Sequence, residues 1–261
     1  MTGEGPTLLH RVTAVLHARQ YVVFFAIPLY ALDVLVPLLS GWLYRGGGFA
    51  DVQRNTWGPL ADAVATRSLV IAGVFVVYVV AKTWLRAGYI RSLTGPLHLG
   101  PDGRGQFARL LGLELILEGI AAASVGVVVV AGATSPLAGT VVVALLVVYL
   151  AVIYSDYIVV LAGAGPLRAI ALSWRTVRRA FIPSALVLLV VTVAGDAAAR
   201  LLSDPVTTSL LRAAPMLFVK CVAMGTLVFI ADVVLIVIYL GTVEEDRRAA
   251  ANERPSPSPG G

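Results

Sequence analysis

Charged residues are scarce in this sequence: Asp, Glu, Lys and Arg make up only 13% of its 261 residues, whereas hydrophobic residues make up 58%. Ordinary soluble domains carry about 25% charged residues, and disordered chains are poor in hydrophobic ones, so both classes are excluded. Cysteine is nearly absent too. The single Cys221 has no partner for a disulfide within the chain, and we expect it to pack as a small buried thiol.

The sequence also lacks the motifs that usually mark an enzyme. Its three histidines, His10, His17 and His98, stand outside the long apolar stretches, and no HExxH, CxxC or GxSxG pattern occurs. No glycine-rich loop carries the lysine of a phosphate-binding loop. We therefore expect a protein that is not an enzyme and that has no cofactor and no metal site.

Six long apolar stretches, in contrast, occupy about half of the chain. They cover residues 21–44, 69–85, 110–130, 137–160, 181–199 and 216–240. A hydrocarbon core of about 30 Å requires about 20 helical residues, and lipid offers no partner for backbone polar groups, so such stretches form transmembrane helices. The sequence predicts an all-α fold, a polytopic transmembrane helical bundle of six spans with amphipathic cytoplasmic helices.

The arginines indicate how the spans are oriented. Thirteen lie in the lead-in, the second and fourth connections and the tail, whereas five lie on the opposite side. Basic residues beside spans stay in the cytoplasm, so we expect a multi-pass protein of the cell membrane with both termini cytoplasmic. We expect residues 1–20 to form an amphipathic cytoplasmic lead-in, residues 21–240 the transmembrane domain, and residues 241–261 a disordered cytoplasmic tail. The net charge of +5 then favours anionic lipid headgroups, rather than nucleic acid, as partners.

Charged residues inside spans are costly and are therefore candidates for function. Five of them form a candidate intramembrane polar site: Lys82, Glu114, Glu118, Asp156 and Asp232. Another acid, Asp33, lies near the middle of the first apolar stretch. Glu114 and Glu118 are four residues apart and share one helix face, which favours a cation or proton site. Structural pairing of each acid within the bundle is one alternative, and a lipid-headgroup site is another.

A candidate ion pair joins Asp196 and Lys220. The two residues lie about one turn inside the facing ends of two consecutive antiparallel spans, so their depths match. Consecutive helices usually pack together. We therefore expect their charged atoms within about 4 Å of each other, or joined by a water.

Residues 167–181 have the pattern of an amphipathic helix in the fourth connection. Apolar residues recur at helical spacing, and most of the arginines fall on a different face. The candidate headgroup-binding residues are Arg168, Trp174, Arg175, Arg178 and Arg179. A helix in the headgroup layer with Trp174 at the interface fits this pattern. A cytoplasmic helix packed against the bundle fits it equally well.

The segment 154–179, YSDYIVVLAGAGPLRAIALSWRTVRR, resembles the signature of the membrane domain fused to some glycerophosphoryl diester phosphodiesterases and of related six-span proteins of bacteria and archaea. The matching residues are Asp156, Tyr157, Val159, Gly165, Ala169, Ser173, Trp174, Arg175, Val177 and Arg178. The segment 85–93, LRAGYIRSL, is similar to the pattern after the family's second span. Members often carry an acidic residue where this chain has Ala162, Gly163 and Ala164. The resemblance implies the six-span architecture but no reaction, since the phosphodiesterase activity of the fused relatives belongs to a separate soluble barrel.

Three functions are compatible with these patterns. The leading hypothesis is a non-catalytic integral membrane protein, a scaffold or accessory in envelope or lipid homeostasis, because the resembling domain accompanies a lipid-related hydrolase. The alternative is a small secondary transporter or channel that uses the intramembrane carboxylates Glu114 and Glu118. The third hypothesis is a membrane enzyme that acts on lipid. An internal repeat would favour transport, but the similar segments WLRAGYIR and SWRTVRR lie two spans apart rather than three.

Overall fold

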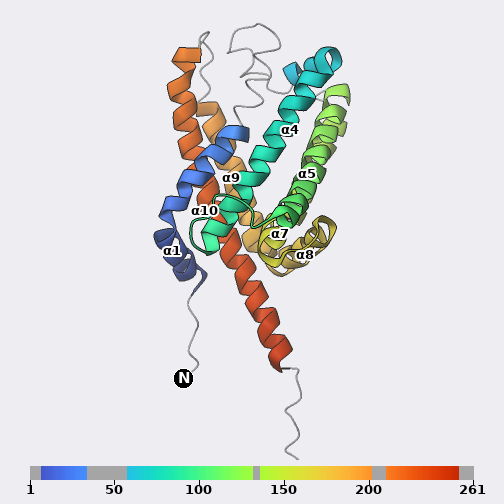
Figure 1. The fold of residues 1–261 in the computed structure, drawn as a ribbon. Coiled ribbons are helices and arrows are strands. Elements are labelled where there is room, and N and C mark those ends of the chain that lie inside the picture. The colour runs from blue at the N-terminus through green and yellow to red at the C-terminus, as the bar shows by residue number, and fades with distance from the viewer. Residues whose placement is uncertain (1–6, 34–57, 132–135, 202–209, 253–261) are drawn as a thin grey trace, which may run out of the picture.

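The computed structural model describes residues 7–33, 58–131, 136–201 and 210–252, and the regular structure in these ranges is helical. The elements are α1 (Leu8–Ala18), the 3₁₀ turn η1 (Gln20–Val22), the helical residues 23–33, α4 (Gly58–Thr94), α5 (Arg104–Ala131), α6 (Pro136–Val152), α7 (Ser155–Ala162), α8 (Pro166–Arg179), α9 (Phe181–Leu201) and α10 (Leu210–Asn252). The long helices run side by side as a bundle, with α7 and α8 gathered at one end (Figure 1). The predicted all-α class is confirmed for this part of the chain.

Several helices are long and apolar enough to cross a membrane. Three pass by length and composition: Gly73–Thr94, Gly139–Ala162 and Pro215–Asn252. Two bent helix pairs, Leu8–Ala18 with Gln20–Asp33 and Pro166–Arg179 with Phe181–Gly195, raise the number to five within the described ranges. The predicted stretch 110–130 lies in α5, which is not among these helices and which carries Glu114 and Glu118. Such apolar helices suggest a membrane location.

The predicted span 137–160 is a broken helix. α6 ends at Val152, two turn residues follow, and α7 begins at Ser155. The Ser173 hydroxyl on α8 donates to the Ala151 carbonyl (2.7 Å) and accepts from the Tyr154 N–H (3.1 Å). A helix break inside a bundle is tolerated where other groups satisfy the freed backbone. Ser173 thus joins α6 to α7 across the break.

α8 lies across the end of the bundle. α7 ends on Gly163, whose φ of 65° is the left-handed conformation that favours glycine, and Pro166 opens α8. The chain then bends by 102° between α8 and α9. A helix over residues 167–181 is thereby confirmed, except that it ends at Arg179 and Phe181 already begins α9.

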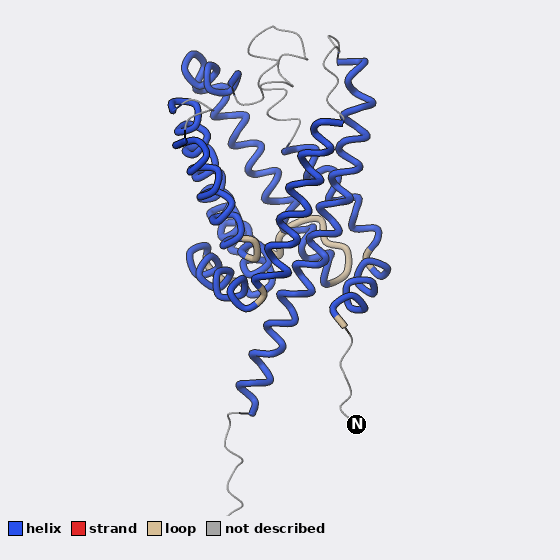
Figure 2. Tube along the Cα trace, turned by 180° about the vertical axis from the view of Figure 1, so that it is seen from behind, coloured by secondary structure: helices blue, strands red, loops and turns tan. Residues whose placement is uncertain are grey.

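α1 and the C-terminal end of α10 lie at the same end of the bundle (Figure 1). Arg11 of α1 contacts Glu244 of α10 at 3.8 Å. Seen from behind, α10 extends beyond the other helices at the end of the bundle where α1 lies (Figure 2). Because α10 continues to Asn252, residues 241–252 are helical rather than part of a disordered tail. The rest of the predicted tail, 253–261, lies outside the described residues.

Candidate functional site

The candidate site follows one face of α4, where Tyr78, Lys82 and Arg86 recur every four residues. This spacing stacks the three side chains one helical turn above the next. Lys82 and Arg86 line a cavity of about 310 Å³ inside the bundle. The cavity is bounded by side chains from residues 23–33 and from α4, α5, α6, α7, α9 and α10, so it is a property of the whole fold.

Lys82 is surrounded by three carboxylates. Its Nζ lies 2.7 Å from Glu118 Oε1, 3.4 Å from Asp33 Oδ1 and 3.7 Å from Glu114 Oε2. The Tyr78 hydroxyl donates to Asp33 (2.5 Å) and accepts from the Lys82 ammonium (3.3 Å). We call Lys82, Tyr78, Asp33, Glu114 and Glu118 the lysine cluster. Asp33 is its most open member, with 43% of its side chain exposed, whereas Glu114 is only 5% exposed.

Arg86 is held by two carboxylates in a more directional way. Its Nε donates to Asp156 (3.0 Å), and its two terminal nitrogens donate to the two oxygens of Asp232 (2.8 and 3.3 Å). The Tyr157 hydroxyl also donates to Asp232, and the rings of Tyr89 and Tyr157 lie 5.4 and 5.8 Å from the guanidinium carbon. We call these five residues the arginine cluster. A planar guanidinium that bonds a carboxylate through two nitrogens is fixed in position and orientation.

The charges that line the cavity do not balance. Five carboxylates face two cations, which leaves an excess of three negative charges if all seven described groups ionise. The charged side chains are Asp33, Lys82, Arg86, Glu114, Glu118, Asp156 and Asp232. In a site with little water, such an excess is costly unless protons or a bound cation neutralise it. The arrangement can therefore bind positive charge.

The structure brings together all five residues of the predicted intramembrane site, since Lys82, Glu114, Glu118, Asp156 and Asp232 line this one cavity. They belong to α4, α5, α7 and α10. The juxtaposition of Glu114 with Glu118 follows from their spacing, but the approach of Asp156 and Asp232 depends on how the helices pack.

Sequence reasoning missed two charged members of the site. Arg86 was counted with the arginines of the second connection, whereas α4 continues to Thr94 and holds Arg86 within the bundle, with 17% of its side chain exposed. Asp33 was recognised as an acid inside a span but left out of the site. The four-residue spacing from Lys82 to Arg86 was the signal that could have found the arginine. Tyr78 lies four residues before Lys82 and so carried the same signal, whereas for Tyr157 the sequence offered only its place in the resembling segment 154–179.

The predicted ion pair of Asp196 with Lys220 cannot be placed. The Asp196 side chain lies outside the described residues, although its backbone belongs to α9. Lys220 is half-buried on α10. The pair stays a prediction.

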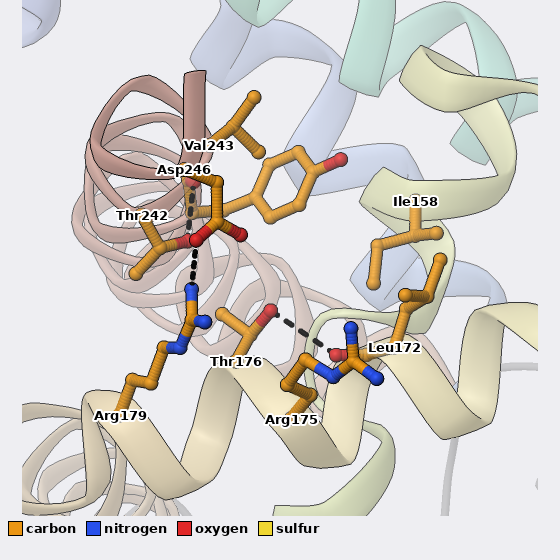
Figure 3. A pocket seen from close by; sticks show the side chains of 9 residues that line it. Ile158, Leu172, Arg175, Thr176, Arg179, Thr242, Val243 and Asp246 are labelled. Carbon is orange, nitrogen blue, oxygen red and sulfur yellow. Dashed lines mark hydrogen bonds and ion pairs between the residues drawn. The ribbon is translucent and has the colours of Figure 1, made fainter. Parts of the chain in front are cut away.

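A smaller cavity of about 110 Å³ lies between α8 and α10 (Figure 3). Arg175 and Arg179 point toward it from α8, and Arg179 forms an ion pair with Asp246 of α10. The other candidate headgroup residues on α8, Arg168 and Arg178, are exposed, as is 42% of Trp174. The buried side of α8 consists of Ala169, Ser173, Thr176 and Val177. α8 therefore packs on the bundle through these four residues, and its four arginines are exposed, two of them beside the smaller cavity.

Comparison with known proteins yields no match: no protein-family model, no curated protein sequence and no solved structure corresponds to this chain. The site must be interpreted from its own chemistry. Within the described ranges, no group of three or more His, Cys, Asp or Glu side chains is placed to hold a metal ion.

Proposed function

We propose that this chain is a multi-pass membrane protein that binds a cation or protons in the 310 Å³ cavity and moves them across the membrane, as a small secondary transporter or channel. The observation that supports this function best is the excess of carboxylates over cations in one cavity inside an apolar helical bundle. Ion pairing within the bundle would need no such excess. Intramembrane acids that exceed their partners are typical of ion pathways and proton relays.

Exposure within the cavity gives the proposed pathway a direction. The Asp33 side chain is 43% exposed, Glu118 21% and Glu114 5%, and Lys82 lies among all three. A cation entering beside Asp33 would meet progressively more buried carboxylates. Asp156 of α7 and Asp232 of α10 lie beside the next turn of α4, where Arg86 binds both. The lysine cluster is therefore the proposed binding position and the arginine cluster the fixed wall behind it.

Transport by purified protein in liposomes tests this function. We expect wild-type protein to carry a proton or cation flux under an imposed membrane potential, followed by a pH-sensitive dye or by tracer uptake. Glu118→Gln and Glu114→Gln remove cavity carboxylates without changing side-chain volume and should reduce that flux about tenfold or more. Glu245→Gln, at an exposed position near the end of α10, is the matched control and should leave it unchanged. Wild-type flux no greater than that of protein-free liposomes, for protons and for all cations tried, would exclude the transport function.

The proposed topology places six spans in the cell membrane with both ends of the chain in the cytoplasm. Support comes from the arginine distribution, which stays at twelve against five after Arg86 is moved into the bundle. Support also comes from the shared position of α1 and the end of α10 (Figure 1). Single cysteines at Ala249 and at Leu137, in a Cys221→Ser background, test it with a membrane-impermeant thiol reagent. We expect labelling of intact cells at position 137 only, and labelling at position 249 would reverse the orientation.

A second candidate function is the non-catalytic scaffold or accessory role in lipid homeostasis. The observation that favours it is the outward face of α8, where Arg168, Arg175 and Arg178 are exposed beside Trp174. Arginines and a tryptophan on one helix at a bundle end fit anionic headgroups. The resemblance of residues 154–179 to the membrane domain of phosphodiesterase fusions supports the same role. Purification with retained anionic lipid, but without any cation flux, would favour this function over transport.

A further inference from the structure

We infer that the ligand of the 310 Å³ cavity is a protonated amine with a small apolar body, and that its ammonium group competes with that of Lys82 for the carboxylates of the lysine cluster. This inference rests on the proposed cation-binding function and specifies its substrate class.

The size of the cavity favours an organic ligand over a bare ion. At about 310 Å³ it lies at the lower end of the roughly 300–1,000 Å³ typical of small-molecule sites. A water molecule occupies only about 30 Å³ in the liquid. A desolvated inorganic cation would fill a small fraction of this space and would leave most of the cavity wall without a contact.

The wall itself is largely apolar and aromatic. Leu117, Val152, Leu188 and Leu235 contribute aliphatic surface, and Tyr30 and Tyr149 add two rings. Small-molecule sites characteristically combine such a lining with a few placed polar groups. Aliphatic walls gain nothing from contact with a metal ion, whereas they stabilise the hydrocarbon part of an amine by removing it from water. Tyrosine rings also attract ammonium groups.

The lysine cluster already shows how the site binds an ammonium group. The Lys82 ammonium lies within 3.7 Å of three carboxylates, donates to the Tyr78 hydroxyl (3.3 Å), and lies 5.5 Å from the centre of the Tyr78 ring. A primary amine presents the same three N–H donors as lysine. The arrangement that holds the ammonium of Lys82 is therefore suited to that of a ligand.

Of the two cations in the cavity, Lys82 is the one that a ligand can displace from its carboxylates. Its ammonium is a point charge on a flexible four-carbon chain, and three carboxylates share it, so two of their negative charges remain available. Arg86, by contrast, is fixed through three nitrogens to Asp156 and Asp232. An incoming ammonium would thus compete at Lys82 and leave the arginine cluster intact.

Competition makes an unusual prediction for Lys82→Met. Removing a residue that contacts a bound ligand normally weakens binding, but removing a competitor strengthens it. We expect Lys82→Met to bind benzylammonium about tenfold more tightly than wild type does, and Glu118→Gln to bind it about tenfold more weakly. The matched control is Lys220→Met. Lys220 is the other lysine of the chain and does not line the cavity, so this substitution should leave the affinity for benzylammonium unchanged.

Binding is measured by calorimetry and by thermal stabilisation of the full chain in detergent micelles. The probes are benzylammonium, the neutral benzyl alcohol of similar shape, and Na⁺ and K⁺. We expect wild type to be stabilised by benzylammonium and far less by benzyl alcohol. Lys82→Gln serves as a second variant if Lys82→Met does not fold, and wild-type binding alone already tests the substrate class.

The contrary outcomes separate the inference from the function on which it rests. Stabilisation by Na⁺ or K⁺ but not by benzylammonium would overturn the amine while leaving cation binding intact. Equal stabilisation by benzyl alcohol would show that the ammonium charge is not recognised, which overturns the amine ligand, while the Na⁺, K⁺ and flux measurements still decide whether cations or protons bind. If both Lys82 variants bind benzylammonium no more tightly than wild type, competition by Lys82 is wrong.

Discussion

Lys82 and Arg86 occupy successive turns of α4 and line the same cavity, yet the two cations are held differently. Lys82 shares three carboxylates, of which Asp33 is 43% exposed. Arg86 bonds two carboxylates through three nitrogens, and its partner Asp232 is only 7% exposed. The lysine cluster has three carboxylates for one cation and is partly exposed at Asp33. In the arginine cluster, hydrogen bonds from three nitrogens fix the cation between two less exposed carboxylates.

This difference indicates how one helix can hold both a binding position and a rigid wall. An exchangeable site needs groups whose partners can change at low cost, which a flexible lysine among several carboxylates provides. A wall needs interactions that are lost only together, which a guanidinium bonded to two acids provides. The two residue types are therefore not interchangeable along α4.

The largest expected effect comes from Arg86→Met. The substitution leaves Asp156 and Asp232 buried without their cation, which should lower the free energy of unfolding by about 3–5 kcal/mol. Lys82→Met should cost less, about 1–2 kcal/mol, because Asp33 and Glu118 are more exposed than the two acids that bind Arg86, at 43% and 21% against 17% and 7%. Denaturant unfolding in detergent micelles measures both. Equal losses for the two variants would remove the distinction between a fixed and an exchangeable cation.

The two acids of the arginine cluster should also differ. Asp232 accepts two hydrogen bonds from Arg86 and one from Tyr157, whereas Asp156 accepts one from Arg86. We expect Asp232→Asn to lower the free energy of unfolding by about 2–3 kcal/mol and Asp156→Asn by about 1 kcal/mol. The double variant Arg86→Met with Asp232→Asn should be less damaging than the sum of the two single changes, because it strands fewer charges. Strict additivity would show that the pair is not coupled.

Much of this architecture could be predicted from the sequence. Apolar length identified the helices, and the arginine and apolar pattern of residues 167–181 identified α8, because both signals are local and repeat along the chain. Five of the seven charged side chains of the proposed site were found because charge is rare in apolar helices. The charge of these five residues within apolar stretches is visible in the sequence without knowledge of the fold.

The rest depends on packing that composition does not encode. Arg86 was assigned to a connection because the apolar run ends beside it, although α4 continues to Thr94. The break between α6 and α7 could not be predicted, because residues 153 and 154 are neither Gly nor Pro. The group that stabilises the break, Ser173, comes from a different helix. Helical continuity and contacts between distant segments are tertiary effects. Only the fold shows them.

Ser173→Ala tests whether the wall is held from outside the cavity. Ser173 satisfies Ala151 and Tyr154 at the break that precedes Asp156 and Tyr157, so its loss should cost about 1–2 kcal/mol in the free energy of unfolding. Ser124→Ala is the matched control, since the Ser124 hydroxyl donates to the carbonyl of Ile120 on its own helix and, among the described residues, to no other group. It should change stability by less than about 0.5 kcal/mol. If the two substitutions cost the same, the hydroxyl of Ser173 does not stabilise the break.

The smallest effect on stability is expected for the pair of Arg179 with Asp246, which extends the comparison to a cation outside the cavity. Both side chains are about half exposed, at 47% and 58%, so water and salt screen their attraction. Asp246→Asn should therefore change the free energy of unfolding by less than about 1 kcal/mol.

The same substitution frees Arg179 beside Arg175 and should raise the affinity for anionic headgroups by about 1 kcal/mol. The extra thermal stabilisation of micelle-solubilised protein by phosphatidylglycerol over phosphatidylcholine measures this gain. Replacing Arg168, Arg175 and Arg179 together by glutamine should have the opposite effect and reduce the extra stabilisation by phosphatidylglycerol. An Asp246→Asn variant that loses several kcal/mol of stability, with no change in lipid preference, would mean that α8 is braced to α10 by this pair rather than poised for headgroups.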